Sequence, residues 1–292
     1  MCDIKKKRAK KALQNKNLQG LIALKSPRQH HYLKATSCCE AGDVKEGKIT
    51  FRYCRSRVCT ICNNIRTAKL INSYSSELDW ERSYLVTLTC RNCTGNSLRS
   101  QIQAMKKVLY NCRQTLRRRG VDLDGIYTME VTYNEKRRTY HPHFHMILSG
   151  VDDEICQQFL DLWRRGCTKV DLKTVTVAQD FRRVKDDSAL LELFKYITKS
   201  LNENPRAVDT IIGATWGLRM VQPFGNIKAQ DEEVEIEKTY SIDAIEGDRF
   251  RWVQDDWYSL LTGESLTELF LTKKPALECA NSRGNSLVVA SG

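Results

Sequence analysis

Residues 125–148 read GIYTMEVTYNEKRRTYHPHFHMIL, and this stretch decides the fold. A run rich in β-branched and aromatic residues stands on each side of the polar connection NEKRRT, which has hairpin length. Alternate side chains of a strand point to the same face, so His141, His143 and His145 are expected to share one. The stretch therefore predicts an antiparallel hairpin with imidazoles repeated on one side.

These imidazoles predict a metal site. An isolated histidine on a strand is more often a surface group, but packing gives no reason to repeat imidazole on one side of an apolar strand. If Tyr133 faces Tyr140 across the turn, Glu130 lies opposite His143, whereas a one-residue bulge would turn it away. A carboxylate with imidazoles and open water positions suits Mg or Mn acting on phosphate. The expected ligands are His143 and His145, with Glu130 and His141 competing for the third place.

Length and cysteine content restrict the class of protein. The 292 residues contain no apolar run of the ~18 residues that a membrane span needs, and no signal-peptide pattern. We therefore expect no membrane partner and a cytoplasmic location. Twelve cysteines without a secretory signal favour clustered metal ligands over disulfides.

The charge is unevenly distributed. The net charge is +12, yet residues 229–292 hold 6 Lys or Arg against 13 Asp or Glu, so the rest of the chain is more basic still. A basic body of this kind implies a polyanionic partner, for which nucleic acid is the default.

Residues 38–62 form a second motif. Cys54-x4-Cys59-x2-Cys62 brings three thiolates together, and one further ligand would complete a tetrahedral zinc site. The segment is rich in arginine and unlike a core, which argues against ordinary buried thiols. Such a closed site would stabilise structure without catalysing a reaction. The candidates for the fourth ligand are Cys38 and Cys39, with His30 and His31 as alternatives.

The expected elements follow the order strand, helix, two strands, helix, strand, helix. The first strand is 84–89, the helix after it runs from Ser97 to about Arg119, the second helix is 152–165, and a strand follows at 169–177. This pattern fits an α+β fold in which helices pack on an antiparallel, ferredoxin-like sheet.

Residues 187–202 predict an amphipathic helix. Opposite its apolar stripe, Glu192, Tyr196 and Lys199 lie within roughly 60° of one another. An exposed face with incidental ion pairs would also explain them. Beside a metal that binds phosphate, however, the phenol is a candidate nucleophile.

Together these motifs resemble rolling-circle replication initiators of the HUH endonuclease superfamily, of the bacterial plasmid type with an N-terminal cysteine motif. The matching segments are the strand YLVTLT (84–89), His-Pro-His-Phe-His (141–145) and Lys-Tyr-x-x-Lys (195–199). RYCRSRVCTIC (52–62) is similar to the family's cysteine-rich segment. The resemblance implies an HUH endonuclease palm preceded by a zinc-stapled segment.

The resemblance also implies roles for single residues. His143 and His145 would bind the divalent ion. Tyr196 would attack one strand of origin DNA, leaving a 5'-phosphotyrosine link and a free 3'-hydroxyl that serves as primer. Lys199 would orient the phosphate or the site, and Glu192 would activate water at termination.

Implied partners are single-stranded or hairpin origin DNA in a prokaryotic cell, a host DNA polymerase, and a host helicase because the chain has no Walker motif. Relaxases usually place the tyrosine near the N-terminus, and HUH transposases are shorter and lack the cysteine segment. The alternative of another class is a non-catalytic, zinc-stapled nucleic-acid-binding protein whose histidines hold a structural metal.

The expected divisions follow these motifs. The C-terminal acidic stretch is either a solvated edge or a clamp against nonspecific DNA, and the aromatic residues after it suit a small packed core or base stacking. A helix after Pro205 and a turn at Trp216–Arg219 are expected to finish the catalytic domain. The predicted parts are a basic arm (1–37), a cysteine-rich zinc-binding segment and helix (38–79), an HUH endonuclease domain (80–225), an acidic and aromatic extension (226–272) and a disordered tail (273–292).

Overall fold

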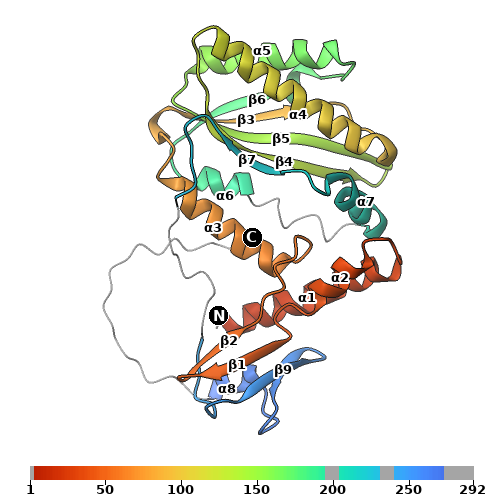
Figure 1. Ribbon diagram of the computed structural model, residues 1–292, viewed down its shortest axis with the longest axis vertical. Helices are drawn as coiled ribbons and strands as arrows, with labels where there is room; N and C mark the ends of the chain where they lie inside the picture. The colour runs from red at the N-terminus through yellow and green to blue at the C-terminus, as the bar shows by residue number, and fades with distance from the viewer. Residues whose placement is uncertain (1–2, 195–203, 231–239, 273–292) are drawn as a thin grey trace. The chain divides into compact units, whose positions relative to one another are not determined.

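The protein has an α+β fold with antiparallel sheets, seen in a computed structural model whose described residues are 3–194, 204–230 and 240–272 (Figure 1). Its contacts divide the chain into two compact units. The first unit comprises Met1–Arg8, Glu40–Phe51 and Thr239–Gly292, and the second comprises Ala9–Cys39 and Arg52–Lys238.

The second unit is built on a sheet with the strand order β6-β3-β5-β4-β7, in which every neighbouring pair is antiparallel. Along the chain the elements follow the order β3, α4, β4, β5, α5, β6, as the sequence predicts. The bounds are β3 Ser83–Thr89, α4 Gly95–Arg118, β4 Asp124–Asn134, β5 Thr139–Ser149, α5 Asp153–Lys169, β6 Asp180–Val184 and β7 Val221–Phe224.

Each face of this sheet is covered by a different pair of helices (Figure 1). Helices α4 and α5 pack on one face, over a core that includes Val86, Phe144 and Trp163. On the other face α3 (Thr60–Ser75) and α6 (Ser188–Phe194) cover Leu85 and Ile147. Burying each such side chain contributes roughly 1.5–3 kcal/mol, so the β3–β5 pairing is held from both sides.

Of the two helices on the first face, α5 begins at a side-chain cap, whereas Thr94 before α4 makes no capping hydrogen bond. The Asp152 side chain accepts a hydrogen bond of 2.9 Å from the N–H of Ile155, and α5 begins at Asp153. Helix α4 begins at Gly95, after Thr94, rather than at the predicted Ser97. Both helices bury an apolar stripe at helical spacing, which fixes the face that each turns to the sheet.

The prediction of a strand at 169–177 is wrong. Helix α5 continues to Lys169, Asp171 has a left-handed backbone (φ 56°), and Leu172 N–H closes the helix end on Cys167 O at 2.9 Å. A 3-10 turn, η2 (Thr176–Ala178), follows, and the edge strand is β6. The β-branched alternation predicts a strand but does not anticipate the helix extension or the left-handed turn.

The basic N-terminal segment is helical. It forms α1 (Asp3–Ala23) and α2 (Gln29–Thr36). In the second unit the Gln14 side chain donates to Ala35 O at 2.9 Å and accepts from Thr60 Oγ1 at 2.9 Å. These bonds connect α1 to α2 and to the start of α3. A 3-10 turn, η1 (Trp80–Arg82), precedes β3, and α7 (Pro205–Thr215) precedes β7.

The first unit contains a sheet that the sequence did not predict. Its strand order is β10-β9-β1-β2-β8, all antiparallel, and α8 (Leu266–Thr272) completes the unit. Trp257 is fully buried, with its ring centroid 4.9 Å from that of Phe51, so it belongs to a packed core rather than a stacking surface. The bounds are β1 Ala41–Lys45, β2 Lys48–Phe51, β8 Tyr240–Ser241, β9 Arg249–Val253 and β10 Asp256–Ser259.

Candidate metal centres and the adjoining cavity

The β4–β5 hairpin has the register that the sequence predicts. Tyr133 pairs with Tyr140, and this places Glu130 directly opposite His143, with no bulge between the two pairs. His145 lies two residues further along β5, so its side chain points to the same face. Ligand atoms of Glu130, His143 and His145 all lie within 4.8 Å of one another.

The spacing of these ligand atoms fits a small divalent cation. Nε2 of His143 lies 3.1 Å from Glu130 Oε2, and Nε2 of His145 lies 3.6 Å from the same oxygen. Neighbouring ligands of an octahedral ion at ~2.1 Å are roughly 3.0 Å apart. The donor set of one carboxylate and two imidazoles could therefore hold such an ion with little rearrangement.

Hydrogen bonds orient both imidazoles toward the carboxylate. Nδ1 of His143 lies 3.1 Å from His141 O and must donate, because a carbonyl oxygen only accepts. Nδ1 of His145 lies 3.2 Å from Thr87 Oγ1 on β3. Each ring is held by Nδ1 and presents Nε2 to the cluster, which is the usual arrangement around protein metal sites.

Glu130 is held as a carboxylate. Burial by itself would raise its pKa, but hydrogen bonding and electrostatic interaction with His143 and His145 outweigh burial and lower the pKa. His141 stands beside the group, with its ring stacked on that of His143 at a centroid distance of 5.1 Å. Burial, the largest cause, and then neighbouring His143 lower the pKa of His141, which favours its neutral form. Geometry thus brings Glu130, rather than His141, to the third position.

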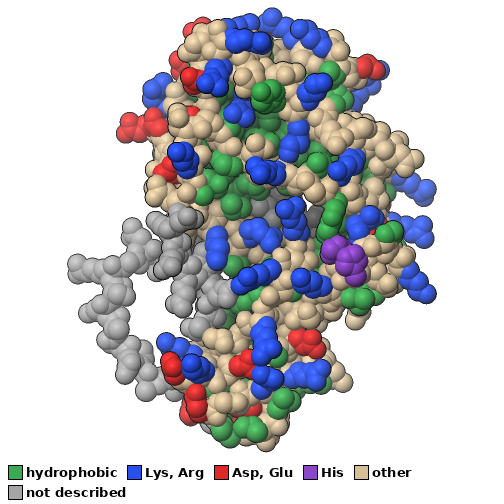
Figure 2. Space-filling view, viewed as in Figure 1, with side chains coloured by type: hydrophobic (Ala, Val, Ile, Leu, Met, Phe, Trp, Pro, Cys, Tyr) green, Lys and Arg blue, Asp and Glu red, His purple; other side chains and the backbone are tan. Residues whose placement is uncertain are grey.

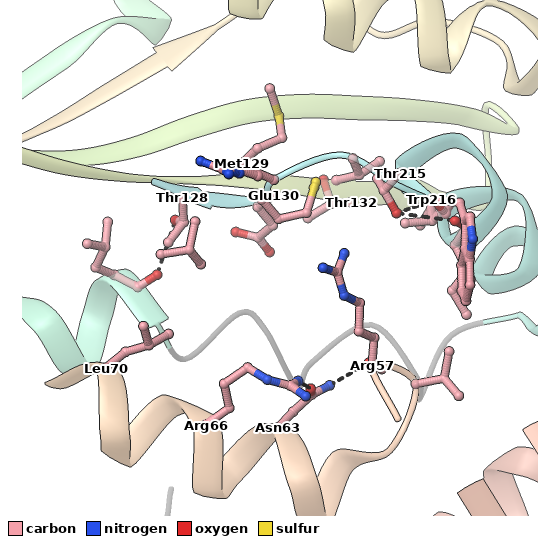
Figure 3. Close-up of a pocket in the computed structure, with 18 residues that line it drawn as sticks. Arg57, Asn63, Arg66, Leu70, Thr128, Met129, Glu130, Thr132, Thr215 and Trp216 are labelled. Carbon is pink, nitrogen blue, oxygen red and sulfur yellow. Dashed lines mark hydrogen bonds between the residues drawn. The ribbon is translucent and has the colours of Figure 1, made fainter. Parts of the chain in front are cut away.

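A cavity of about 460 Å³ opens beside the cluster, and Glu130 is one of its lining residues (Figure 3). Arg57, Arg66 and Arg219 also line it, so guanidinium groups face the space next to the carboxylate. The wall comes from β4, α3, α6, α7 and the turn before β7. Lys and Arg side chains also gather on the surface over the sheet and α3 (Figure 2). A cavity with this charge suits a phosphate-bearing ligand.

The sequence did not predict this cavity. Arg57 stands out in the sequence only as part of an arginine-rich cysteine segment, and Arg219 as part of a closing turn. Their convergence depends on how α3 and the turn after α7 pack beneath β4. No local spacing in the sequence signals such a contact.

Four cysteines converge in the second unit. The Sγ atoms of Cys38 and Cys62 are 3.5 Å apart, those of Cys54 and Cys62 are 3.7 Å apart, and Cys59 Sγ completes the group within 4.8 Å. Sulfurs around a tetrahedral ion with bonds of ~2.3 Å lie about 3.8 Å apart. The described cysteines are all free thiols. The four-sulfur group therefore fits a closed metal site.

Backbone N–H groups are aimed at these sulfurs. Arg55 N–H donates to Cys62 Sγ at 3.3 Å, Ser56 N–H to Cys54 Sγ at 3.4 Å, and Cys62 N–H to Cys59 Sγ at 3.3 Å. Such bonds stabilise thiolate over thiol, and thiolate is the form that binds metal.

The alternatives for the fourth position lie elsewhere. Cys39 has a left-handed backbone (φ 54°), and its N–H donates to Arg52 O at 2.8 Å. It is outside the four-sulfur group, and so are His30 and His31. The ring of His31 packs on that of Trp216, at a centroid distance of 4.3 Å. The structure therefore selects Cys38 among the predicted candidates.

The predicted nucleophile segment is only partly described. Tyr196 and Lys199 lie outside the described residues. Glu192 is on α6, where it forms an ion pair with Arg182 of β6 and is not part of the Glu130 group. The carbonyl oxygen of Leu193, also on α6, accepts a hydrogen bond of 3.2 Å from Thr128 Oγ1, beside His145 in the sheet.

Comparison with known proteins identifies the family. The model of the replication protein family Rep_1 matches residues 48–257, which is most of the chain. The chain belongs to this replication protein family. Protein rep of Streptococcus pneumoniae serotype 2 (strain D39 / NCTC 7466) is 23% identical over 246 residues, covering 76% of this chain and 74% of that protein.

Other relatives carry the same description. Protein rep of Lentilactobacillus hilgardii is 24% identical over 272 residues, covering 80% of this chain and 86% of that protein. Protein rep of Bacillus amyloliquefaciens is 30% identical over 147 residues, covering 46% of this chain and 42% of that protein. No solved structure matches the chain significantly. The relatives support a plasmid replication initiator of the rolling-circle type.

The structure also bears on the membrane expectation. Within the described residues, no helix combines the length and the apolar character that crossing a bilayer requires.

Proposed function

We propose that this Rep protein starts rolling-circle replication by nicking one strand of single-stranded or hairpin origin DNA with Tyr196. The observation that carries the proposal is the convergence of Glu130, His143 and His145 beside a cavity lined by arginines. A carboxylate and two imidazoles suit Mg or Mn, and guanidinium groups suit a phosphodiester backbone. The cavity thus offers both partners of a metal-assisted phosphoryl transfer.

The chemistry would proceed by transesterification. When bound, a divalent ion would supply Lewis-acid polarisation of the scissile phosphate. The Tyr196 oxygen, having lost its proton to solvent, attacks phosphorus while the bond to the 3'-oxygen breaks. The products are a 5'-phosphotyrosine link and a 3'-hydroxyl that a host polymerase can extend, and the reverse reaction rejoins the strand. Lys199 would orient the phosphate, and a host helicase would separate the strands.

The described end of α6 is consistent with this role for Tyr196. Tyr196 follows Phe194 by two residues, which span at most about 7 Å. Leu193 is hydrogen-bonded to Thr128, whose partner in β5 is His145. The last described residues of α6 therefore lie next to the proposed metal ligands.

The topology supports the proposal of an HUH palm. The strand order β6-β3-β5-β4 with α4 and α5 on one face is that of a ferredoxin-like βαββαβ unit. Its two central strands, β3 and β5, carry Thr87 and the histidines, and Glu130 lies on the adjacent β4. Strands packed on both faces would hold the ligands in a fixed geometry.

A covalent adduct tests the proposed function. The protein is incubated with Mn and 5'- or 3'-end-labelled single strands that tile the replicon, then denatured and resolved by electrophoresis. We expect a protein-linked label only with Mn and only for strands that span one site, with the label on the DNA 3' of the cut. Peptide mapping should place the DNA on Tyr196. If no strand yields an adduct, the non-catalytic nucleic-acid-binding alternative holds instead.

Glu192 is proposed to activate water when replication ends. In Glu192→Ala, first-strand nicking should remain within about threefold of wild type, while hydrolytic release of the DNA falls by roughly 10²-fold, as expected on losing a general base. Release is followed as the decay of purified adduct. Arg182→Ala is the control, because it removes the ion-pair partner and keeps the carboxylate. Equal release rates for Glu192→Ala and wild type would rule out the assignment.

We further propose that Cys38, Cys54, Cys59 and Cys62 hold a structural Zn ion. Cys62→Ser should remove bound zinc and destabilise the protein by roughly 3 kcal/mol, lowering the thermal unfolding midpoint by about 6–12 °C. Zinc per chain is measured by mass spectrometry and unfolding by calorimetry. Cys39→Ser is the matched control, because this neighbouring buried thiol lies outside the group and should retain zinc. Zinc loss in Cys39→Ser but not in Cys38→Ser would show that Cys39, and not Cys38, is the fourth ligand.

A further inference from the structure

Trp216 is a large aromatic side chain that remains exposed beside the proposed nicking site. It follows the C-terminal end of α7, lines the same cavity as Glu130, and is 41% exposed (Figure 3). The indole is therefore not enclosed in the packed core, and it is accessible to a ligand in the cavity.

Two imidazole rings pack behind this indole. The centroid of His31 lies 4.3 Å from that of Trp216, with the planes tilted by 35°, and the ring centroid of His30 lies 3.7 Å from that of His31. Burial, and then the electrostatic effects of His30 and Lys34, lower the pKa of His31. The His31 ring extends the aromatic surface of the indole.

Hydrogen bonds fix the backbone at Trp216. Nη1 of Arg99, on α4, donates to Ala214 O at 3.0 Å and to Trp216 O at 2.8 Å. The turn after α7 is thereby tied to a helix that packs on the sheet. An aromatic surface held in place before binding loses little conformational freedom when a ligand arrives.

A second set of hydrogen bonds connects the residues on either side of His31 to α7. Asp209 of α7 accepts hydrogen bonds from Ser26 Oγ at 2.8 Å and from Arg28 Nε at 3.0 Å, and also from the Tyr32 hydroxyl. A side chain at Gly213 would bring its Cβ within 2.8 Å of Arg28 Nη1, so glycine leaves room for this guanidinium. Helix α2 is thus held against α7, and His31 against Trp216.

The cavity provides charge as well as an aromatic surface. Arg57, Arg66 and Arg219 share its lining with Trp216. Aromatic groups that stack on bases, combined with cationic groups that follow the backbone, form the usual recognition surface for single-stranded nucleic acid. Bases inside a duplex have no free face for such stacking.

We propose that Trp216, backed by His31, stacks on an unpaired base of the DNA strand held in this cavity. The inference rests on the proposed function and adds to it a contact that selects single-stranded over duplex DNA. Stacking is tolerant of sequence, so this contact would hold the strand, whichever base occupies it.

Trp216 and His31 together are called the stacking platform. Binding of a simple probe tests this platform without requiring nicking. The probe is a fluorescein-labelled oligothymidylate of roughly 20 nucleotides, longer than one stacking site needs, in buffer without added Mn or chelator. Fluorescence anisotropy should show binding weakened about 5- to 100-fold in Trp216→Leu, which keeps apolar volume but has no aromatic face. The affinity of Trp216→Phe for the probe should stay within about threefold of wild type. The affinity of His31→Ala should lie between those of Trp216→Phe and Trp216→Leu. Binding of the matched oligothymidylate–oligoadenylate duplex should change less than about twofold, because its bases have no free face.

Tyr110→Leu is the matched control. Tyr110 is 57% exposed and lies on α4, which packs on the opposite face of the sheet. Its loss should leave binding of both probes unchanged, and thermal unfolding shows that each variant is folded. If folded Trp216→Leu binds single strands as wild type does, the platform is wrong. It is also wrong if Trp216→Leu loses affinity for the duplex to the same extent as for the single strand.

The two proposals fail in different ways. If wild type forms no covalent adduct but Trp216→Leu still loses single-strand binding without added Mn, the nicking proposal is wrong and the platform stands. If wild type forms the adduct and Trp216→Leu binds single strands normally, the platform is wrong and nicking stands.

Discussion

Replacing Tyr196 with phenylalanine is expected to abolish the covalent protein–DNA adduct while leaving single-strand binding within about twofold of wild type. Phenylalanine keeps the ring and removes the only atom that would attack phosphorus. The described residues that line the cavity include no tyrosine, serine or cysteine, and its hydroxyl groups are the aliphatic ones of Thr128, Thr132 and Thr215. Adduct is measured on labelled origin strand with Mn, and binding on the same strand without added Mn.

Tyr110→Phe provides the matched control. It makes the same chemical change at an exposed tyrosine on α4 and should retain full adduct formation. An adduct in Tyr196→Phe equal to that of wild type would show that another group is the nucleophile. Loss of both adduct and binding would instead show that the hydroxyl helps to hold DNA.

The sequence predicted the centre of the sheet well because the information there is local. Tyr133 and Tyr140 flank a short polar turn, and their pairing sets the register that brings Glu130 opposite His143. The apolar faces of β3 and β5 and the order of helices and strands follow from periodicity. The spacing Cys54, Cys59, Cys62 is likewise local, and only its fourth partner required the structure.

Features that depend on distant pairings could not be predicted in the same way. Strand β1 pairs with β9 across some two hundred residues, so even the alternating residues of β9 give no local indication of their partner strand. The edge strand β6 was misplaced because the β-branched residues before it form a helix end and a turn. The arginines of the cavity and the contact of His31 with Trp216 also join segments far apart in sequence. The expected domain boundaries and the roles of single residues remain predictions.

Replacing His143 with alanine should lower Mn affinity by at least about 100-fold and slow nicking by roughly 10³-fold. His143 is the residue nearest the carboxylate, with Nε2 3.1 Å from Glu130 Oε2. Its loss removes one of three converging ligands and leaves a buried carboxylate with a weaker partner. Mn binding is measured by titration calorimetry, and nicking by the initial rate of adduct formation at saturating DNA.

Two neighbouring variants separate ligation from positioning. His141→Ala removes a ring that stacks on His143 but lies outside the ligand group, so Mn affinity should fall by no more than about tenfold. Thr87→Val removes the oxygen that lies 3.2 Å from His145 Nδ1. Mn affinity should fall roughly tenfold, because the His145 ring is held less firmly but the ligand is still present. In all three variants single-strand binding without added Mn should persist, since the arginines of the cavity are intact. Equal losses of Mn affinity in His141→Ala and His143→Ala would mean that His141 is also a ligand. The ion would then lie nearer to the start of β5 than the positions of Glu130, His143 and His145 indicate.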